Sequence, residues 1–147
     1  MRQIERIFIH CTAGNQNATV EDLMREFKAK GWRYSGYHYL VMANGAIHQL
    51  LPDSEISNGV QGYNSTAINV AYTGGIDAQG KAVDNRTEAQ KTSLRKLLKE
   101  LRGRYPKAVI LGHRDISPDT NGNGRIDPWE RIKECPCFDA KDEYKDL

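Results

Sequence analysis

Short apolar runs typical of β-strands alternate along this chain with segments of helical periodicity, and this alternation constrains the fold more than any other feature. A β-sheet covered by helices is the layered arrangement that such an alternation favours. The 147 residues suffice for one domain and contain no repeats or low-complexity linkers. We therefore predict a single α/β domain over residues 1–147, with a mixed central β-sheet flanked by α-helices. The predicted strands are Arg6–Cys11, Tyr37–Ala43, Ala46–Leu51, Ala67–Thr73 and Ala108–Gly112.

Two segments carry the start signals and the spacing of amphipathic helices. Thr19 begins Thr-Val-Glu-Asp, an N-cap pattern, and the helix that follows is expected to end at Gly31. Thr87 begins Thr-Glu-Ala-Gln, which opens the second helix in the same way. The expected buried positions are Val20, Leu23, Met24 and Phe27 in the first helix and Leu94, Leu97, Leu98 and Leu101 in the second.

The Asn44-Gly45 pair separates two apolar-rich runs and predicts a β-hairpin. Both central residues of a type I′ turn need a positive φ, which Asn and Gly adopt at little cost. We expect such a turn between the strands Tyr37–Ala43 and Ala46–Leu51.

Three residues far apart in the sequence have the chemistry of a zinc site. His10 ends the first strand run, on the same face as Phe8, while His113 follows the last strand run and Cys135 lies further on. Open α/β sheets place their sites at such strand ends. Two imidazoles and one thiolate suit zinc and leave a fourth tetrahedral position for water, which indicates a catalytic site. No CxxC or HExxH spacing is present, so only folding can bring these ligands together.

Two alternatives remain open for these residues at the level of sequence. A histidine at a strand end, taken alone, is more often a hydrogen-bonded structural group than a ligand. A zinc ion that only stabilises a fold has four protein ligands, and Cys11 or Cys137 would be candidates for the fourth.

Composition limits the partners and the compartment. The net charge is only +2, and the seven lysines and arginines gathered between residues 91 and 107 are interrupted by acidic residues. We therefore interpret this basic cluster as a solvated helix face and do not expect nucleic acid as a partner. An odd count of three cysteines argues against a disulfide scaffold. We expect a monomer made in the cytoplasm, without a signal peptide or a membrane span. The cluster comprises Lys91, Arg95, Lys96, Lys99, Arg102, Arg104 and Lys107, with Glu88 and Glu100 among them.

The segment 119–130 matches the twelve-position calcium loop of an EF-hand at every oxygen-bearing place. Gly124 stands at the sixth position, where the loop turns sharply. The alternative is a polar loop that fits the pattern by chance. We predict a structural Ca²⁺ site in an insertion over residues 119–130. Its ligands would be Asp119, Asn121, Asn123, Arg125 through its carbonyl, Asp127 and Glu130.

Several motifs occur in the order in which one enzyme family has them, and together they span nearly the whole chain. They are Ile9-His10-Cys11-Thr12-Ala13, Gly36-Tyr37-His38-Tyr39, Gly62-Tyr63-Asn64, Gly74-Gly75-Ile76-Asp77, Gly112-His113-Arg114-Asp115 and Lys133-Glu134-Cys135-Pro136. The chain resembles the zinc-dependent N-acetylmuramoyl-L-alanine amidases, which are related to peptidoglycan recognition proteins and to small leaderless phage lysozymes that are amidases. It differs in the loop at 119–130, in Asn58-Gly59 where many relatives have a histidine, and in Cys137 where the phage enzymes have serine.

The resemblance implies zinc on His10, His113 and Cys135, with Tyr37 and Lys133 as catalytic partners. The reaction implied is hydrolysis of the amide between N-acetylmuramic acid and L-alanine in peptidoglycan. The alternative is a module that binds peptidoglycan fragments without cutting them, which related proteins do when the ligand cysteine is replaced. By this resemblance the protein acts on the bacterial cell wall after release from the cytoplasm, like a phage or prophage endolysin.

Overall fold

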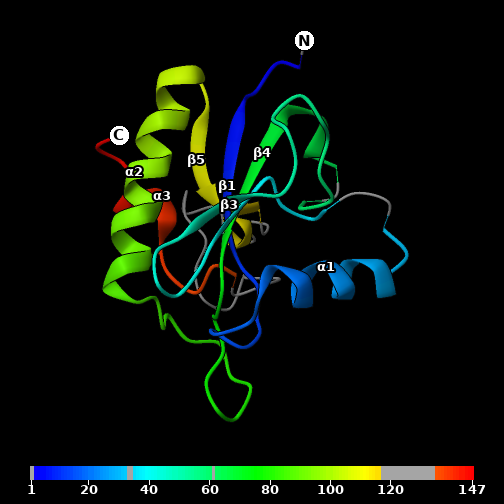
Figure 1. The fold of residues 1–147 in the computed structure, drawn as a ribbon. Coiled ribbons are helices and arrows are strands. Elements are labelled where there is room, and N and C mark those ends of the chain that lie inside the picture. Colours follow the sequence, from blue (N-terminus) through cyan, green and yellow to red (C-terminus); the bar gives the residue numbers. More distant parts are fainter. Residues whose placement is uncertain (1, 33–34, 61, 117–134) are drawn as a thin grey trace, which may run out of the picture.

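A five-stranded mixed β-sheet forms the centre of the molecule (Figure 1). The computed structural model describes residues 2–32, 35–60, 62–116 and 135–147. The strand order is β3-β2-β4-β1-β5, in which β2 and β3 are antiparallel and the other neighbours are parallel. The predicted fold class is therefore confirmed. The strands are β1 (Arg6–Cys11), β2 (Tyr39–Val41), β3 (Ile47–Gln49), β4 (Ala67–Tyr72) and β5 (Val109–Gly112).

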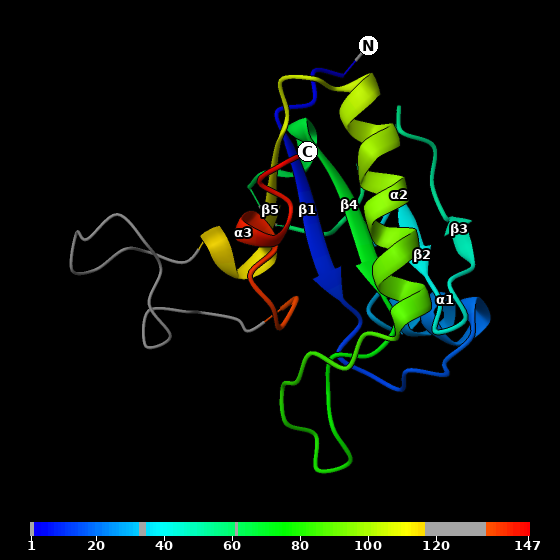
Figure 2. The ribbon, with the colours of Figure 1, turned by 90° about the vertical axis from the view of Figure 1, so that its left-hand side faces the viewer.

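Helices cover the two faces of the sheet and make three layers. Figure 2 shows the long helix α2 (Glu88–Arg104) lying across one face, with the short C-terminal helix α3 (Ala140–Glu143) beside β5. Helix α1 (Val20–Ala29) packs on the opposite face. Short 3₁₀ helices span Asn64–Thr66 and His113–Ile116. Among the described helices, none has both the length and the apolar character needed to cross a membrane.

The larger core lies between α2 and the sheet. The four leucines predicted to be buried in this helix, Leu94, Leu97, Leu98 and Leu101, are all buried there. They pack against alternate residues of β1, including Ile7 and Ile9, because successive strand residues point to opposite faces. His10 thus points to the other face, toward the layer that contains α1.

The N-caps were predicted correctly, but the buried stripe of α1 is narrower than predicted. Thr19 and Thr87 each form a capping box with the residue three positions later. In α1 only Leu23 and Phe27 are buried, whereas Met24 is 39% exposed. The reason is that α1 covers a small part of the sheet, where its core partners are Leu40 and Ala71.

The hairpin was predicted correctly, whereas its turn type was not. β2 and β3 pair with Val41 opposite Ile47, and the amide of Met42 donates to the carbonyl of Ala46 at 2.8 Å. Three residues lie between the hydrogen-bonded pair Met42 and Ala46, and of these only Gly45 has a positive φ, at 88°. This geometry is that of a longer loop with one left-handed glycine. The Asn44 side chain accepts a hydrogen bond from the Ala46 amide at 2.9 Å. Asn44 therefore stabilises the turn through its side chain and not by adopting the positive φ of a type I′ turn.

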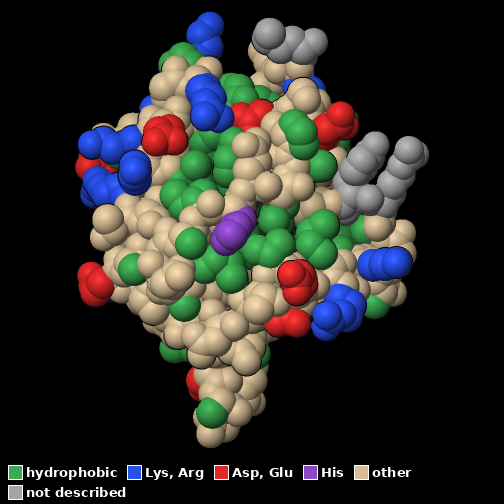
Figure 3. Space-filling view, in the orientation of Figure 1, with side chains coloured by type: hydrophobic (Ala, Val, Ile, Leu, Met, Phe, Trp, Pro, Cys, Tyr) green, Lys and Arg blue, Asp and Glu red, His purple; other side chains and the backbone are tan. Residues whose placement is uncertain are grey.

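The basic cluster lies on the exposed side of α2. Figure 3 shows Lys and Arg side chains gathered over this helix, with acidic side chains among them. Lys91 lies 3.5 Å from Glu88, and Arg95 pairs with Asp146 of the C-terminal segment. These contacts agree with the interpretation of a solvated, charge-paired helix face.

Candidate metal centre

The sheet places the two candidate histidine ligands side by side. β1 and β5 are parallel neighbours, with Ile9 opposite Gly112, so the residues that follow this pair meet at one edge. His10 is the next residue of β1, and His113 begins the 3₁₀ helix after β5. Their ring centroids lie 4.9 Å apart. The prediction that strand ends would deliver both imidazoles to one place is consistent with this geometry.

Several contacts hold Cys135 and the following Pro136 beside these histidines. The Arg114 amide donates to the Cys135 carbonyl at 2.8 Å, and the Tyr72 hydroxyl donates to the Pro136 carbonyl at 2.7 Å. Gly112 allows the close approach, since a Cβ at this position would lie 2.7 Å from the Pro136 ring. The Cys11 amide donates to the Cys135 sulfur at 3.1 Å, which helps to fix the position of this sulfur.

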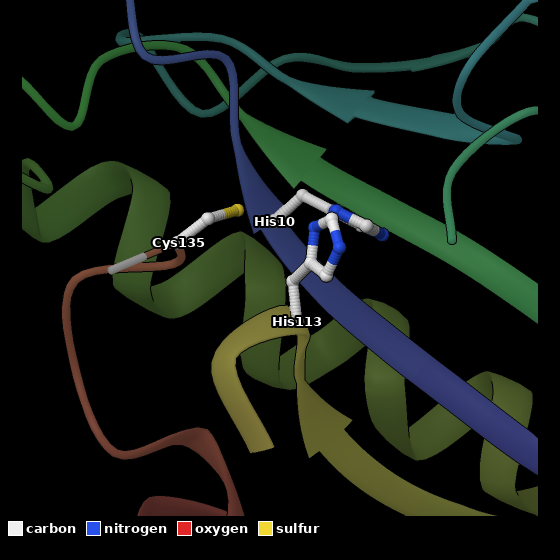
Figure 4. A group of neighbouring side chains, drawn as sticks. All are labelled: His10, His113 and Cys135. Atoms are coloured by element: carbon white, nitrogen blue, oxygen red, sulfur yellow. The ribbon is translucent and has the colours of Figure 1, made fainter. Parts of the chain in front are cut away.

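The three side chains form a group that fits a metal ion. One nitrogen from each imidazole and the Cys135 sulfur all lie within 4.8 Å of one another, and Figure 4 shows the sulfur directed toward the rings. Zinc bonds of about 2.0–2.3 Å put tetrahedral ligand atoms roughly 3.3–3.8 Å apart, a spacing that lies within this limit. Within the described ranges no fourth His, Cys, Asp or Glu joins this group.

Tyr37 lies next to the metal group, just before β2. Its ring centroid is 5.1 Å from that of His10, and its hydroxyl is 3.4 Å from the Cys11 carbonyl. Ser35 fixes the backbone here, because its hydroxyl donates to the Tyr37 carbonyl and accepts from the Tyr37 amide. Burial, with Cys135 nearby, raises the pKa of Tyr37, so that its hydroxyl stays protonated at neutral pH.

A pocket of about 230 Å³ opens over the metal group. Its wall includes Phe27 and Trp32, which stack with centroids 5.4 Å apart. The Lys30 ammonium lies 4.9 Å from the centroid of the Trp32 ring. Among the described residues, the pocket therefore combines the three candidate metal ligands, a phenol, an aromatic wall and one cation. Sequence reasoning did not select Phe27, Lys30 or Trp32 as site residues.

A buried amide next to His10 was also missed. His10 and Asn69 are almost fully buried, and His10 Nε2 lies 2.7 Å from Asn69 Oδ1. Asn69 is a polar residue inside the apolar run of β4, and a buried polar side chain requires hydrogen-bond partners. That single polar position in a buried strand was the signal in the sequence.

Other predicted site residues lie elsewhere or outside the described residues. The described group includes Cys135 but not Cys11 or Cys137, whose sulfurs lie 3.9 Å apart. Lys133 lies outside the described residues, as does the whole predicted calcium loop. Its ligands Asp119, Asn121, Asn123, Arg125, Asp127 and Glu130 therefore remain sequence predictions.

Comparison with known proteins shows similarity along nearly the whole chain. A family profile described as Amidase_2, N-acetylmuramoyl-L-alanine amidase, matches residues 1–130. An endolysin of Enterobacteria phage K11 is 35% identical over 142 residues, which are 95% of this chain and 85% of the relative.

Solved structures show the same fold. The Ph2119 endolysin from Thermus scotoductus MAT2119 bacteriophage Ph2119 has a TM-score of 0.71 and 27% identity, covering 92% of this chain and 79% of that chain. A complex of peptidoglycan recognition proteins LCa and LCx with tracheal cytotoxin contains a chain with a TM-score of 0.66 and 20% identity. That match covers 92% of this chain and 77% of the other, and at this identity it shows the fold alone.

Proposed function

Because this chain belongs to the N-acetylmuramoyl-L-alanine amidase family, we propose that it is a zinc-dependent hydrolase of the amide bond between N-acetylmuramic acid and L-alanine in peptidoglycan. The observation that carries this proposal is the convergence of His10, His113 and Cys135. They come from three distant parts of the chain, and their donor atoms lie within 4.8 Å of one another beneath a pocket. Such a set of nitrogen and sulfur donors suits zinc.

The ligand set matches the chemistry that the reaction needs. Bound zinc would supply Lewis acidity toward the scissile carbonyl and would make water a usable nucleophile near neutral pH. His10 and His113 would contribute neutral imidazoles, and Cys135 would contribute the thiolate form in which cysteine binds zinc, with its sulfur positioned by the Cys11 amide. With the three ligands that the described residues provide, a tetrahedral zinc ion would have one position for the reacting molecules.

Tyr37 and Lys133 would act on the substrate rather than on the metal. The protonated Tyr37 hydroxyl lies beside His10 and can donate a hydrogen bond to the oxygen that becomes negatively charged during amide hydrolysis. Lys133, two residues before Cys135, would bring an ammonium to the same oxygen. The role of Lys133 rests on its sequence position and on the family resemblance.

The pocket wall suits a peptidoglycan fragment. The faces of sugar rings and the apolar parts of a stem peptide can pack on the aromatic pair Phe27 and Trp32. Stem peptides carry carboxylates, and Lys30 places a positive charge at the same wall. We propose that the stem peptide lies along this wall while its first amide bond faces the metal group.

The second candidate function is binding of peptidoglycan fragments without cleavage. The likeness in fold to peptidoglycan recognition proteins, one of which was solved with bound tracheal cytotoxin, supports this alternative. The cysteine that completes the metal group favours the enzyme, because a pure binding site has no need of an open metal position. The endolysin relatives favour the bacterial cell wall as the place of action.

Treatment of purified sacculi separates the two functions. An amidase releases soluble stem peptides, loses this activity in a chelator and regains it when zinc is added back. The Cys135→Ser variant is the matched control, since it removes one ligand atom while keeping the side-chain size. Binding to sacculi with no peptide release at any zinc concentration would favour the recognition module instead.

A further inference from the structure

Asn69 is a buried amide whose orientation can be deduced from its partners. The Val60 amide, which can only donate, lies 2.7 Å from Asn64 Oδ1. That contact identifies the Asn64 atom as the oxygen. Asn69 presents its Nδ2 to the same oxygen at 3.4 Å and to the Ser57 hydroxyl at 2.7 Å. The amide nitrogen of Asn69 therefore faces these two acceptors.

The orientation of Asn69 determines which nitrogen of His10 carries a proton. With its nitrogen facing Ser57 and Asn64, Asn69 turns its oxygen to His10 Nε2 at 2.7 Å. An amide oxygen only accepts, so His10 Nε2 must donate and carries the hydrogen. In a neutral imidazole the lone pair then belongs to Nδ1. Figure 4 shows one ring nitrogen of His10 beside His113 and the other directed away, toward β4.

The backbone of Asn69 is held as firmly as its side chain. Its amide donates to His38 Nδ1 at 3.0 Å, and its carbonyl accepts from the His38 amide at 2.8 Å. His38 is fully buried, and its Nε2 lies 2.8 Å from the Glu55 carbonyl. Burial lowers the pKa of His38, which keeps this imidazole neutral. Asn69 thus has fixed partners in both its backbone and its side chain.

Gly59 makes room for the Asn69 amide. A Cβ at position 59 would lie 2.3–2.6 Å from three side-chain atoms of Asn69, closer than real contacts allow. The φ of Gly59 is not in the left-handed region, so the requirement for glycine here is one of space. The amide of Asn69 fills the volume that a side chain at position 59 would need.

We propose that Asn69 is a positioning residue that holds His10 in the tautomer with a proton on Nε2, so that the Nδ1 lone pair is directed to the metal. This inference rests on the proposed function for the identity of the metal site. Hydrogen-bonded partners of this kind orient ligand imidazoles, and their loss costs about 10–100-fold in metal affinity. Ser57 and Asn64 set the direction of the amide, and Gly59 leaves it the space.

The test compares Asn69→Leu, which has a similar size but no acceptor, with Asn69→Asp, which keeps an acceptor for His10. Nitrogen chemical shifts of the His10 ring, measured by NMR on the metal-free proteins, report the tautomer. Zinc affinity is measured by competition with a chromophoric chelator. We expect a single Nε2-protonated tautomer in the wild type and in Asn69→Asp. Asn69→Leu should show mixed tautomers and bind zinc about 10–100-fold more weakly.

Two further variants separate positioning from general stability. Val70→Ala alters the next buried residue of β4, which packs in the core on the opposite face, and should lower stability without changing the tautomer or the zinc affinity. Gly59→Ala keeps Asn69 but displaces its amide, and should weaken zinc binding as Asn69→Leu does. If Asn69→Leu does not fold, Asn69→Ala takes its place.

The outcomes distinguish this inference from the proposed function. An unchanged His10 tautomer in the leucine variant, with zinc affinity within twofold of the wild type, would overturn the role of Asn69 and leave the hydrolase intact. Failure of the wild type to bind zinc would overturn the metal proposal. The tautomer comparison, made without metal, would still decide the role of Asn69.

Discussion

At the scale of single residues, two cysteines that are two positions apart have different surroundings. The Cys135 sulfur joins the histidine group, whereas the Cys137 sulfur lies 3.9 Å from that of Cys11 and 3.3 Å from the Gly75 carbonyl. We expect Cys135→Ser to weaken zinc binding by more than roughly 100-fold, because loss of a ligand costs more than loss of a supporting residue. Cys137→Ser should bind zinc like the wild type.

Cobalt substitution measures this difference directly. The intensity of the thiolate-to-cobalt absorption band should correspond to one sulfur ligand in the wild type and in Cys137→Ser. A band of undiminished intensity in Cys135→Ser would show that another cysteine is the ligand.

Tyr37 offers a test of the hydroxyl separate from the ring. Tyr37→Phe keeps the ring packing against His10 and Phe27 and removes only the hydroxyl. If that hydroxyl stabilises the developing negative charge, hydrolysis should slow by about 10²–10³-fold while zinc affinity stays unchanged. Time courses of peptide release from sacculi measure the rate of hydrolysis, and zinc titrations of the same proteins measure the affinity. A rate equal to that of the wild type would remove Tyr37 from the mechanism.

Lys133 is tested in the same assay. Lys133→Ala should leave zinc bound and slow hydrolysis by about 10²-fold if the ammonium stabilises the oxyanion. Lys133→Arg keeps a positive charge and is the matched comparison. Full turnover in the alanine variant would mean that the lysine has no catalytic role.

At the scale of elements, a buried arginine fastens the C-terminal helix to the segment before α2. Arg86 forms ion pairs with Asp84 and Glu143, at 2.8 and 2.7 Å, and stacks over Phe138. Hydrogen bonding to Arg86 lowers the pKa of Glu143 below its ordinary 4.5. At Asp84 burial raises the pKa, but the hydrogen bonds and charge of Arg86 outweigh burial, so the pKa is also lowered from 3.8. Both carboxylates are therefore more stable as anions in the folded state.

The expected result is a loss of stability that depends on pH. Arg86→Met should lower the free energy of unfolding by about 1–3 kcal/mol at pH 7, less than for a fully buried pair because both carboxylates are partly exposed to solvent. Lowered folded pKa values give stability that is present above the ordinary values of 3.8 and 4.5 and is lost as the pH falls below them. Urea unfolding should therefore show the difference between wild type and variant shrinking from pH 6 to pH 3.

A matched control uses an exposed ion pair. Arg25 lies 3.4 Å from Asp22, and both side chains are largely exposed, so Arg25→Met should change stability at neither pH. An Arg86→Met difference that stays constant with pH would show that packing on Phe138, rather than charge, accounts for the effect.

The calcium loop is an element that the sequence alone predicts. Titration with Ca²⁺ followed by calorimetry should show one site, and the Asp119→Ala/Glu130→Ala double variant should lose it. We expect calcium to raise the melting temperature and the zinc affinity of the wild type, since the loop leads directly to Lys133 and Cys135. Equal zinc affinity and melting temperature in both proteins with added calcium would rule out this coupling.

At the scale of the whole molecule, patterns local in sequence predicted the elements well. The caps at Thr19 and Thr87 and the buried leucines of α2 are determined by residues only a few positions away. They could therefore be read from the sequence. The turn at Gly45 packs against α2, where the Ser93 hydroxyl donates to the Gly45 carbonyl, and the exposure of Met24 depends on how α1 meets the sheet. Such tertiary contacts override local preference, so these two features differed from prediction.

The two histidines of the site could be predicted from the sequence because both stand at the ends of predicted strands. His10 and His113 follow apolar runs, and parallel neighbours bring strand ends together. The position of Cys135 depends on contacts with Gly112, Arg114 and Tyr72 that no local pattern contains. Asn69 was missed for the same reason, since its partners Ser57 and His10 come from distant segments.

The most direct measurement of the central claim is identification of the bond that is cut. A defined muropeptide with N-acetylmuramic acid joined to its stem peptide is incubated with the zinc-loaded protein, and the products are analysed by mass spectrometry. We predict free N-acetylmuramic acid and an intact stem peptide with a new amino group on L-alanine, and no products from Cys135→Ser. Cleavage at a glycosidic bond or within the peptide, or an uncut substrate with zinc bound, would contradict the account.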